Sequence, residues 1–406
     1  MFHLARVRTH FCRLVLLLVG LFLGVLCFAN PQIALADDFD EGQNIAPWHR
    51  VYLTNGQTYN VGSASSNTTV YINKPGTYTL TGSSSHMRLV IETGWVDIYL
   101  TDGLKIDTGA LSYVGSRTAA INVDDMGGTV RLISRPNATI TLTGYAGAPA
   151  IRKEGTNTRL EFLTEDPMRP GTIHATASLI GGAGIGSLGR QVGPTVVTVG
   201  NIHFYSGVVD ARGGRNGAGI GGGDHDVLDG LTISGGLIFA QGGGHTPTLS
   251  GGAAGIGGGC MGSGKNIVIS GGTVTATGGE NGAGIGGGMM SSSWGGDGIN
   301  ITISGGMVTA TGTWGGAGIG GGWEGNARNI TISGGAVVAT GGSANGCGIG
   351  GGGGQYYGTG QGIVISGGTV IARGGDHGSG IGSTSTGDGE TSVTISGGMG
   401  NSHRRQ

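Results

Sequence analysis

A short acidic run, GGGDHDVLDG, places three carboxylates close together in the sequence, at Asp224, Asp226 and Asp229. Glycoside hydrolysis requires a carboxyl pair, one group as the acid and the other as base or nucleophile. On a strand, Asp224 and Asp226 would point the same way, about 7 Å apart, with His225 between them. The same oxygens could instead hold Ca²⁺, as a low-affinity metal site at Asp224 and Asp226, and a solvated turn is the third alternative.

Aromatic residues recur in the loop that follows each Gly-Ile-Gly motif, at Trp294, Trp323, Tyr356 and Tyr357. Equivalent positions in stacked repeats align along one edge. Aromatic faces pack on the C–H faces of sugars, so these four residues are the candidate ligand-binding residues for a flat polysaccharide. The alternative is that each loop folds over its own repeat with the ring as a lid. The loops before the motif are expected to form an opposite, polar stripe.

The stretch ENGAGIGGGMM contains Gly282, Gly284 and Gly287 at the G-x-G-x-x-G spacing of a dinucleotide-binding turn. That function requires one strand–turn–helix unit with an acidic residue about 20 positions later. Here the motif recurs with no helical pattern after it, marked by Ile185, Ile220, Ile256, Ile285, Ile319, Ile349 and Ile381. The motif is therefore predicted to be architectural.

Each repeat also contains an apolar-x-apolar-Ser-Gly-Gly phrase followed by a second short alternation, as in ITISGGMVTATG. Ile301 and Ile303 are predicted to face one way and Thr302 and Ser304 the other, which is the period-two pattern of strands. Val308 and Ala310 continue the alternation after the Gly-Gly corner. One coil cannot bury its own inward face, so the coils must stack.

The fold class predicted is all-β, a right-handed parallel β-helix with about 7 Gly-rich repeats of 29–36 residues plus less regular N-terminal coils. Expected segments are a signal peptide (1–36), a flexible lead-in or cap (37–50), irregular β-helix coils (51–180) and the Gly-rich β-helix (181–400). The sequence NSHRRQ (401–406) replaces the strand expected there, so this tail is predicted to reflect a truncation.

The N-terminus predicts export. Three arginines precede the apolar run LVLLLVGLFLGVLCFA, and ALA before Asp37 resembles a cleavage site. A secreted or extracellular location is expected, with attachment to the cell wall as an option in a full-length protein. Cleavage leaves no membrane span, and the two cysteines that remain, Cys260 and Cys347, are expected to be buried free thiols.

Charge gives no reason to expect a nucleic-acid partner, because 22 Lys and Arg balance 24 Asp and Glu and no basic run stands out. No cofactor is expected apart from the Ca²⁺ alternative, and the chain is expected to be a monomer.

The units NITISGG, VTATGG and GAGIGGG, preceded by GTYTLTG and VDIYLTDGLKI, resemble those of secreted bacterial Gly-rich parallel β-helix proteins of the carbohydrate-binding-domain-containing or surface adhesin type. The resemblance implies a secreted or cell-surface module for polysaccharide binding or adhesion, with polysaccharide or a host or cell-surface glycan as partner, and no catalytic residues. The alternatives are a polysaccharide lyase or glycoside hydrolase on the same scaffold, or a purely structural stalk.

Overall fold

The computed structural model describes residues 49–65, 67–110, 118–178, 181–189, 195–244, 251–289, 296–355, 358–384 and 391–405. The predicted signal peptide and almost all of the lead-in lie outside the described residues. Every described element is a strand or a short 3₁₀ turn, the turns being η1 (Val61–Ser63) and η2 (Thr108–Ala110). No helix in these ranges has the length and apolarity needed to cross a bilayer.

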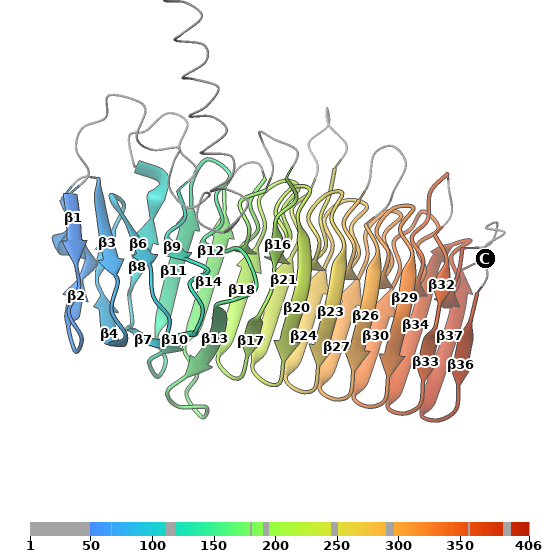
Figure 1. Ribbon diagram of the computed structural model, residues 1–406. Helices are drawn as coiled ribbons and strands as arrows, with labels where there is room; N and C mark the ends of the chain where they lie inside the picture. The colour runs from blue at the N-terminus through green and yellow to red at the C-terminus, as the bar shows by residue number, and fades with distance from the viewer. Residues whose placement is uncertain are drawn as a thin grey trace, which may run out of the picture. The chain divides into compact units, whose positions relative to one another are not determined.

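The strands form three parallel sheets, and each coil of the chain contributes to them in the order A, B, C (Figure 1). Sheet A contains β1 (His49–Tyr52), β3 (Thr68–Ile72), β6 (Met87–Ile91), β9 (Ile121–Val123), β12 (Ile151–Lys153), β15 (Ile185–Gly186), β19 (Ile220–Gly221), β22 (Ile256–Gly257), β25 (Ile285–Gly286), β28 (Ile319–Gly320), β31 (Ile349–Gly350) and β35 (Ile381–Gly382).

Sheet B lies next along each coil. It contains β2 (Thr58–Asn60), β4 (Gly76–Thr81), β7 (Val96–Leu100), β10 (Thr129–Ser134), β13 (Arg159–Thr164), β17 (Ile202–Phe204), β20 (Val227–Ile233), β23 (Gly264–Ile269), β26 (Gly298–Ile303), β29 (Ala327–Ile332), β33 (Ile363–Ile365) and β36 (Val393–Ile395), with β16 (Thr198–Val199) beside β20 and β32 (Gly360–Gln361) beside β29.

Sheet C completes the coil after the Ser-Gly-Gly corner. It contains β5 (Ser83–Ser84), β8 (Lys105–Asp107), β11 (Thr139–Gly144), β14 (Thr172–Ala177), β18 (Val208–Arg212), β21 (Leu237–Gln241), β24 (Thr273–Thr277), β27 (Met307–Thr311), β30 (Ala336–Thr340), β34 (Thr369–Asp376) and β37 (Met399–Arg405).

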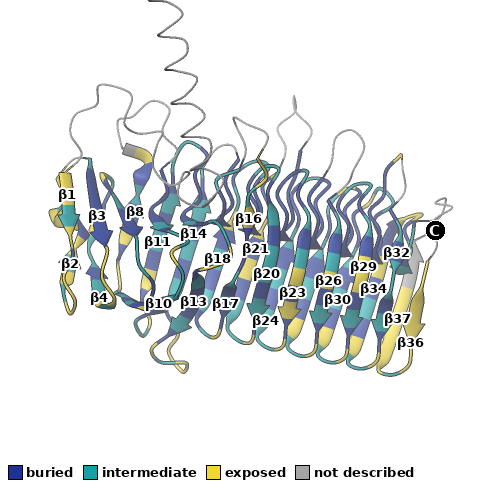
Figure 2. Ribbon diagram, in the orientation of Figure 1, coloured by how far each residue is buried: buried dark blue, intermediate teal, exposed yellow. Residues whose placement is uncertain are grey.

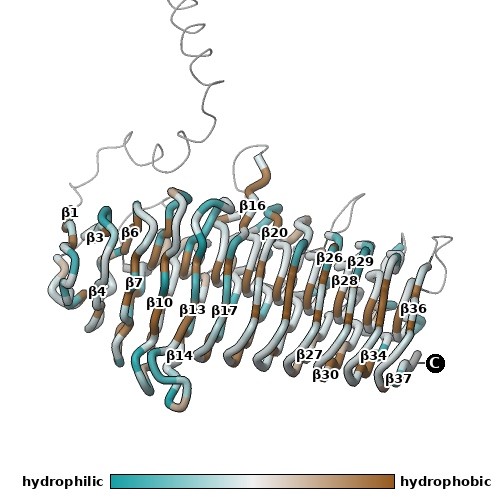
Figure 3. The backbone as a smooth tube through the Cα atoms, turned by 60° about the horizontal axis from the view of Figure 1, so that its bottom comes forward, coloured by the Kyte–Doolittle hydropathy of each residue, from teal (hydrophilic) through white to brown (hydrophobic). Residues whose placement is uncertain are grey.

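Successive coils stack in register, so the inward apolar side chains of neighbouring coils pair with one another. In sheet A, Ile285 pairs with Ile256 on one side and Ile319 on the other. The predicted inward residues Ile301 and Ile303 are fully buried. Figures 2 and 3 show the buried, apolar positions as columns that run through the stack. The all-β parallel β-helix is therefore confirmed, while the right-handed sense of the coil stays a prediction.

Glycine after each marker isoleucine allows a close approach of neighbouring backbones. Gly286 has φ +135°, and a Cβ built on it would lie 2.0 Å from the carbonyl oxygen of Gly320 in the next coil. In the N-terminal coils the same register column holds side chains, because Gly186 pairs with Arg152 and Arg152 with Asn122. The same column is therefore occupied by glycine in the repeats and by larger residues in the N-terminal coils.

The expectation that NSHRRQ replaces a strand is wrong for the residues that the structure describes. β37 runs from Met399 to Arg405 and pairs in parallel with β34, with Thr369 opposite Met399. The Gly-Gly corner before it keeps the repeat geometry, with φ +84° at Gly398. Backbone pairing does not depend on side-chain type, so polar residues can occupy this strand.

Candidate functional site

The predicted site residues divide between described and undescribed loops. Trp294, Tyr356 and Tyr357 lie outside the described residues. Trp323, Asp224 and Asp226 lie in described turns between sheets A and B, at the corner that follows each Ile-Gly strand. The structure therefore locates one of the four predicted aromatic residues and both predicted metal ligands.

The Trp323 ring packs against glycines of its own and the next coil. A Cβ on Gly315 would meet Cε3 of Trp323 at 2.2 Å, and one on Gly354 would meet Cε2 at 3.0 Å. The backbone N–H of Trp323 donates to the backbone carbonyl of Asn281 at 2.8 Å. This contact supports the lid alternative for Trp323, and it corrects the expectation of opposite stripes, because the loops before and after the motif bond to each other.

The acidic run does not form the strand on which its paired geometry depended. Asp224 and His225 lie in a turn, and β20 begins only at Val227. Asp224 Oδ1 lies 3.2 Å from Nδ1 of His225. Left-handed backbone at His225, with φ +69°, turns the chain here and breaks the alternation.

Asp226 is only 1% exposed. Its Oδ1 accepts the N–H of Val197 at 2.9 Å, and its Oδ2 accepts the N–H of Gly189 at 3.2 Å. Burial raises the pKa of Asp226 to about 6. Backbone N–H groups thus occupy both oxygens, and no cluster of three or more His, Cys, Asp or Glu suited to a metal ion occurs in the described ranges.

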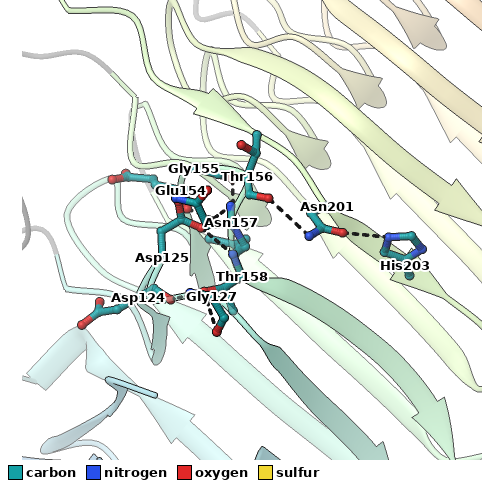
Figure 4. A network of polar contacts seen from close by, with 11 residues as sticks. Asp124, Asp125, Gly127, Glu154, Gly155, Thr156, Asn157, Thr158, Asn201 and His203 are labelled. Atoms are coloured by element: carbon teal, nitrogen blue, oxygen red, sulfur yellow. Dashed lines mark hydrogen bonds and ion pairs between the residues drawn. The ribbon is translucent and has the colours of Figure 1, made fainter. Parts of the chain in front are cut away.

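A second polar network occupies the same corner in earlier coils (Figure 4). Asp125 Oδ1 accepts the N–H groups of Asn157 and Thr158 at 2.8 and 2.7 Å, and its Oδ2 accepts Nδ2 of Asn157 at 2.8 Å. These bonds hold the turn between β12 and β13 against the previous coil. The network therefore fixes the start of β13, where the exposed face of sheet B begins.

Lys153 and Glu154 extend this network inward. Lys153 is fully buried, and its Nζ donates to the carbonyls of Gly155 and Glu154 at 2.8 and 3.0 Å. Burial lowers the pKa of Lys153, against the opposing effect of Asp125. Burial alone would raise the pKa of Glu154, but Arg152 at 2.8 Å, the backbone N–H of Leu188 and the Lys153 charge together hold the pKa below its ordinary value. Lys153 is enclosed by the fold, whereas the Glu154 side chain remains 26% exposed at the end of the network.

Sheet B carries a row of paired charges across three consecutive coils. Arg131 on β10 donates from Nη1 to Asp97 on β7 at 3.0 Å and from Nε to Glu161 on β13 at 2.9 Å. Glu161, which is 7% exposed, also lies 2.7 Å from Nε of Arg159 through its second oxygen. Register pairing puts Asp97, Arg131 and Glu161 in one column, so the row is fixed by the stack.

Aromatic rings continue this row on the next coil. His203 on β17 pairs in register with Glu161, and its ring stacks on Tyr205 with centroids 6.2 Å apart. The Arg159 guanidinium donates to the Tyr205 hydroxyl and lies 5.9 Å from the ring centroid. Burial, followed by the Arg159 charge, lowers the pKa of His203, which favours the neutral ring. Figure 4 shows Asn201 linking this histidine to the corner network.

We name this surface the sheet B ladder and define it as Asp97, Arg131, Glu161, Arg159, His203 and Tyr205. It presents fixed planar groups and a Tyr205 ring that is 38% exposed. Such groups form paired hydrogen bonds with adjacent hydroxyls and pack on apolar ring faces. The ladder could not be predicted from the sequence because hydrogen-bonded members on neighbouring coils are 30 to 46 residues apart in irregular coils. The only signal was charged residues at strand positions that hold Thr in the later repeats.

Comparison with known proteins identifies the repeat but no function. The profile of the Beta helix repeat family matches residues 205–224, 231–260, 267–289, 301–323, 330–353 and 363–387. These segments contain every marker isoleucine from Ile220 to Ile381, and the first marker, Ile185, lies before them. No curated protein and no solved structure matched the chain.

Proposed function

We propose that this chain of β-helix repeats is a secreted or cell-surface binding module that holds polysaccharide on the sheet B ladder without cleaving it. The observation that carries the proposal is the ladder itself: paired arginines and carboxylates on three successive strands, followed by a histidine–tyrosine ring stack. Its groups are held in place by one another and by the sheet, so ordering them costs little when a ligand binds.

The pairing of charges favours an uncharged, hydroxyl-rich ligand. The ladder as a whole holds two arginines, Arg131 and Arg159, and two carboxylates, Asp97 and Glu161, so neither sign of charge is in excess across it. A charged polymer would have to break these pairs. A polysaccharide chain laid along the axis would instead meet a different polar or aromatic side chain of the ladder at each coil, spaced by about 4.8 Å.

Two features favour binding over catalysis. Asp97 and Glu161 are each engaged by an arginine, whereas a glycosidase needs one carboxyl free to protonate the leaving oxygen. Asp226, whose pKa is raised to about 6, is covered by the fold and cannot reach a polymer on the surface. A module that binds without converting its ligand fits these observations best.

A glycan array probed with and without a chelator is the first test. We expect retention of one or more neutral polysaccharides, with no change on removal of Ca²⁺ and no release of reducing ends or unsaturated products. Product release would identify an enzyme instead, and retention of nothing would favour the stalk alternative.

A polysaccharide pull-down with ladder variants tests whether the ladder is the binding surface. Tyr205→Ala and His203→Ala are expected to lower retention about tenfold each, because each removes part of the ring stack. Thr331→Ala, on the outward face of β29 in the same sheet, is the matched control and should bind as the parent does. Normal retention of both ladder variants would reject this surface.

The loop aromatics are tested separately. Trp294→Ala combined with Trp323→Ala should leave retention unchanged, because the Trp323 ring already packs on Gly315. Loss of retention in this double variant, with the ladder variants normal, would move the site to the loops. The exported location rests on the leader, and mass spectrometry of the secreted product should find Asp37 at its N-terminus.

A further inference from the structure

The outward face of sheet C is dominated by threonine in the central repeats. β24 presents Thr273, Thr275 and Thr277, and β27 presents Thr309 and Thr311. The pattern breaks on β18 and β21, and a shallow hollow of about 380 Å³ lies at this break. It is lined by Asp210, Arg212, Phe239, Ala240, Gln241, Thr275 and Thr277. Its volume is within the range of roughly 300–1,000 Å³ that small-molecule sites occupy.

One wall of the hollow is a neutralised ion pair. Arg212 donates from Nε and Nη2 to the two oxygens of Asp210, at 3.1 Å each, which is a bidentate fork. Nδ1 of His174 lies 3.3 Å from the same carboxylate. Asp210 therefore balances Arg212 and fixes its plane, so this wall offers directed hydrogen bonds rather than a free charge.

The floor is an aromatic ring between polar neighbours. Phe239 is 39% exposed, and register places it between Asp210 and Thr275. Arg212 and Thr277 flank Gln241 in the next column. An apolar ring face with amide, hydroxyl and guanidinium groups along one side matches a sugar ring, which has C–H faces and a hydroxyl rim.

We propose that this hollow binds one residue of an uncharged glycan, with the sugar ring on Phe239 and its hydroxyls on the Asp210–Arg212 pair and Gln241. The site extends the proposed glycan-binding function, on which it rests, to a second face of the β-helix. It uses none of the residues of the sheet B ladder, so the two sites can be tested apart.

Calorimetric titration with soluble oligosaccharides tests the proposal. The probes are cellohexaose, mannohexaose and chitohexaose, which are uncharged, and hexagalacturonate, which is anionic. We expect at least one uncharged probe to bind, with an affinity about tenfold lower in Phe239→Ala and retained in Phe239→Trp. Thr309→Ala, at the same outward position on β27, is the matched control and should bind as the parent does.

Phe239 faces outward, so truncating it should not unfold the chain, and unchanged circular dichroism of Phe239→Ala would verify this. The proposal is overturned if no uncharged probe binds, if hexagalacturonate alone binds, or if Phe239→Ala binds as the parent does. Tyr205→Ala is titrated in parallel. Binding lost in Phe239→Ala but kept in Tyr205→Ala supports the hollow even if the ladder proposal fails. Binding kept in Phe239→Ala but lost in Tyr205→Ala rejects the hollow and leaves the ladder proposal standing.

Discussion

The N-terminal coils and the Gly-rich repeats use the same stack of three sheets, but they join neighbouring coils differently. In the N-terminal coils, side chains on adjacent strands pair across the stack, as Arg131 does with Asp97 and Glu161. In the repeats, glycines let the backbones themselves approach, as at Gly286 against Gly320. The glycine column of the repeats therefore tolerates almost no side chain, whereas the same column in the N-terminal coils holds Arg152 and Asn122.

The largest expected effect comes from adding one methyl group to a repeat corner. Gly286→Ala would put a Cβ 2.0 Å from the Gly320 carbonyl oxygen, at φ +135°, a conformation that alanine rarely adopts. The backbone fixes the position of Cβ, and the Gly320 oxygen is itself a backbone atom, so no rotamer change relieves the clash. We expect a loss of about 3–5 kcal/mol in the free energy of unfolding, measured by urea denaturation.

Asn122→Ala is the matched change in the N-terminal coils, in the same register column. It removes only the bond from Nδ2 to Asp124 at 2.7 Å, so we expect a loss of about 1 kcal/mol or less. Equal losses in the two variants would show that the corners do not differ as described.

The next effect is a pH dependence at the junction of the two regions. Asp226, in the turn before β20, accepts the backbone N–H groups of Gly189 and Val197 in the preceding coil, and its pKa is raised to about 6. The native carboxyl therefore holds its proton more tightly than the unfolded one, whose pKa is about 3.9. This group favours folding most below about pH 4, and that contribution is lost as the pH rises to about 6.

Asp226→Asn should remove this dependence. The stability of the parent relative to the variant should fall by up to about 3 kcal/mol between pH 4 and pH 7, measured by denaturation at each pH. A difference between parent and variant that stays constant over this range would contradict the raised pKa.

Arg131→Ala should have a moderate effect confined to the N-terminal coils. The change leaves Glu161, which is 7% exposed, with Arg159 as its remaining arginine. Because Arg131 is itself partly exposed, we expect a loss of only about 1–2 kcal/mol, which added salt should reduce. The check is denaturation at low and high ionic strength, with Thr302→Ala on β26 as a control. An effect unaltered by salt would argue that Arg131 acts by packing alone.

The smallest expected effect is on the exposed amide row of the repeats. Asn300 has φ +55°, and it bonds to Asn266 at 2.9 Å and to Asn329 at 3.1 Å. Asn300→Ala should cost about 1 kcal/mol, because alanine disfavours this backbone and makes neither bond. Asn300→Gly should cost less, as Gly362 occupies an equivalent positive-φ position. Thermal melts of both variants are the measurement. An Asn300→Ala variant more stable than Asn300→Gly would count against the role of backbone conformation.

The core of the repeats was predictable because the apolar-x-apolar-Ser-Gly-Gly phrase and the Gly-Ile-Gly motif recur every 29–36 residues. The alternation at Ile301 and Ile303 predicted inward residues, and both are buried. Cys260 and Cys347 are buried free thiols, as expected. The turns were not predictable at the same level, since His225 adopts a left-handed conformation that ends the alternation before Asp226. The ladder was missed because pairing Asp97 with Arg131 and Glu161 requires the register of coils whose loops differ in length.

The register of the repeats means that the number of coils can change without disturbing the columns of the core. Ile285 and Gly286 sit in the same columns as Ile319 and Gly320. Removing Gly286 through Ile319 would therefore join Ile285 directly to Gly320. Ile285 and Gly320 would then form one Ile-Gly strand with the same neighbours in each column. Removing or duplicating one whole coil would therefore shorten or lengthen the stack while leaving every column in register.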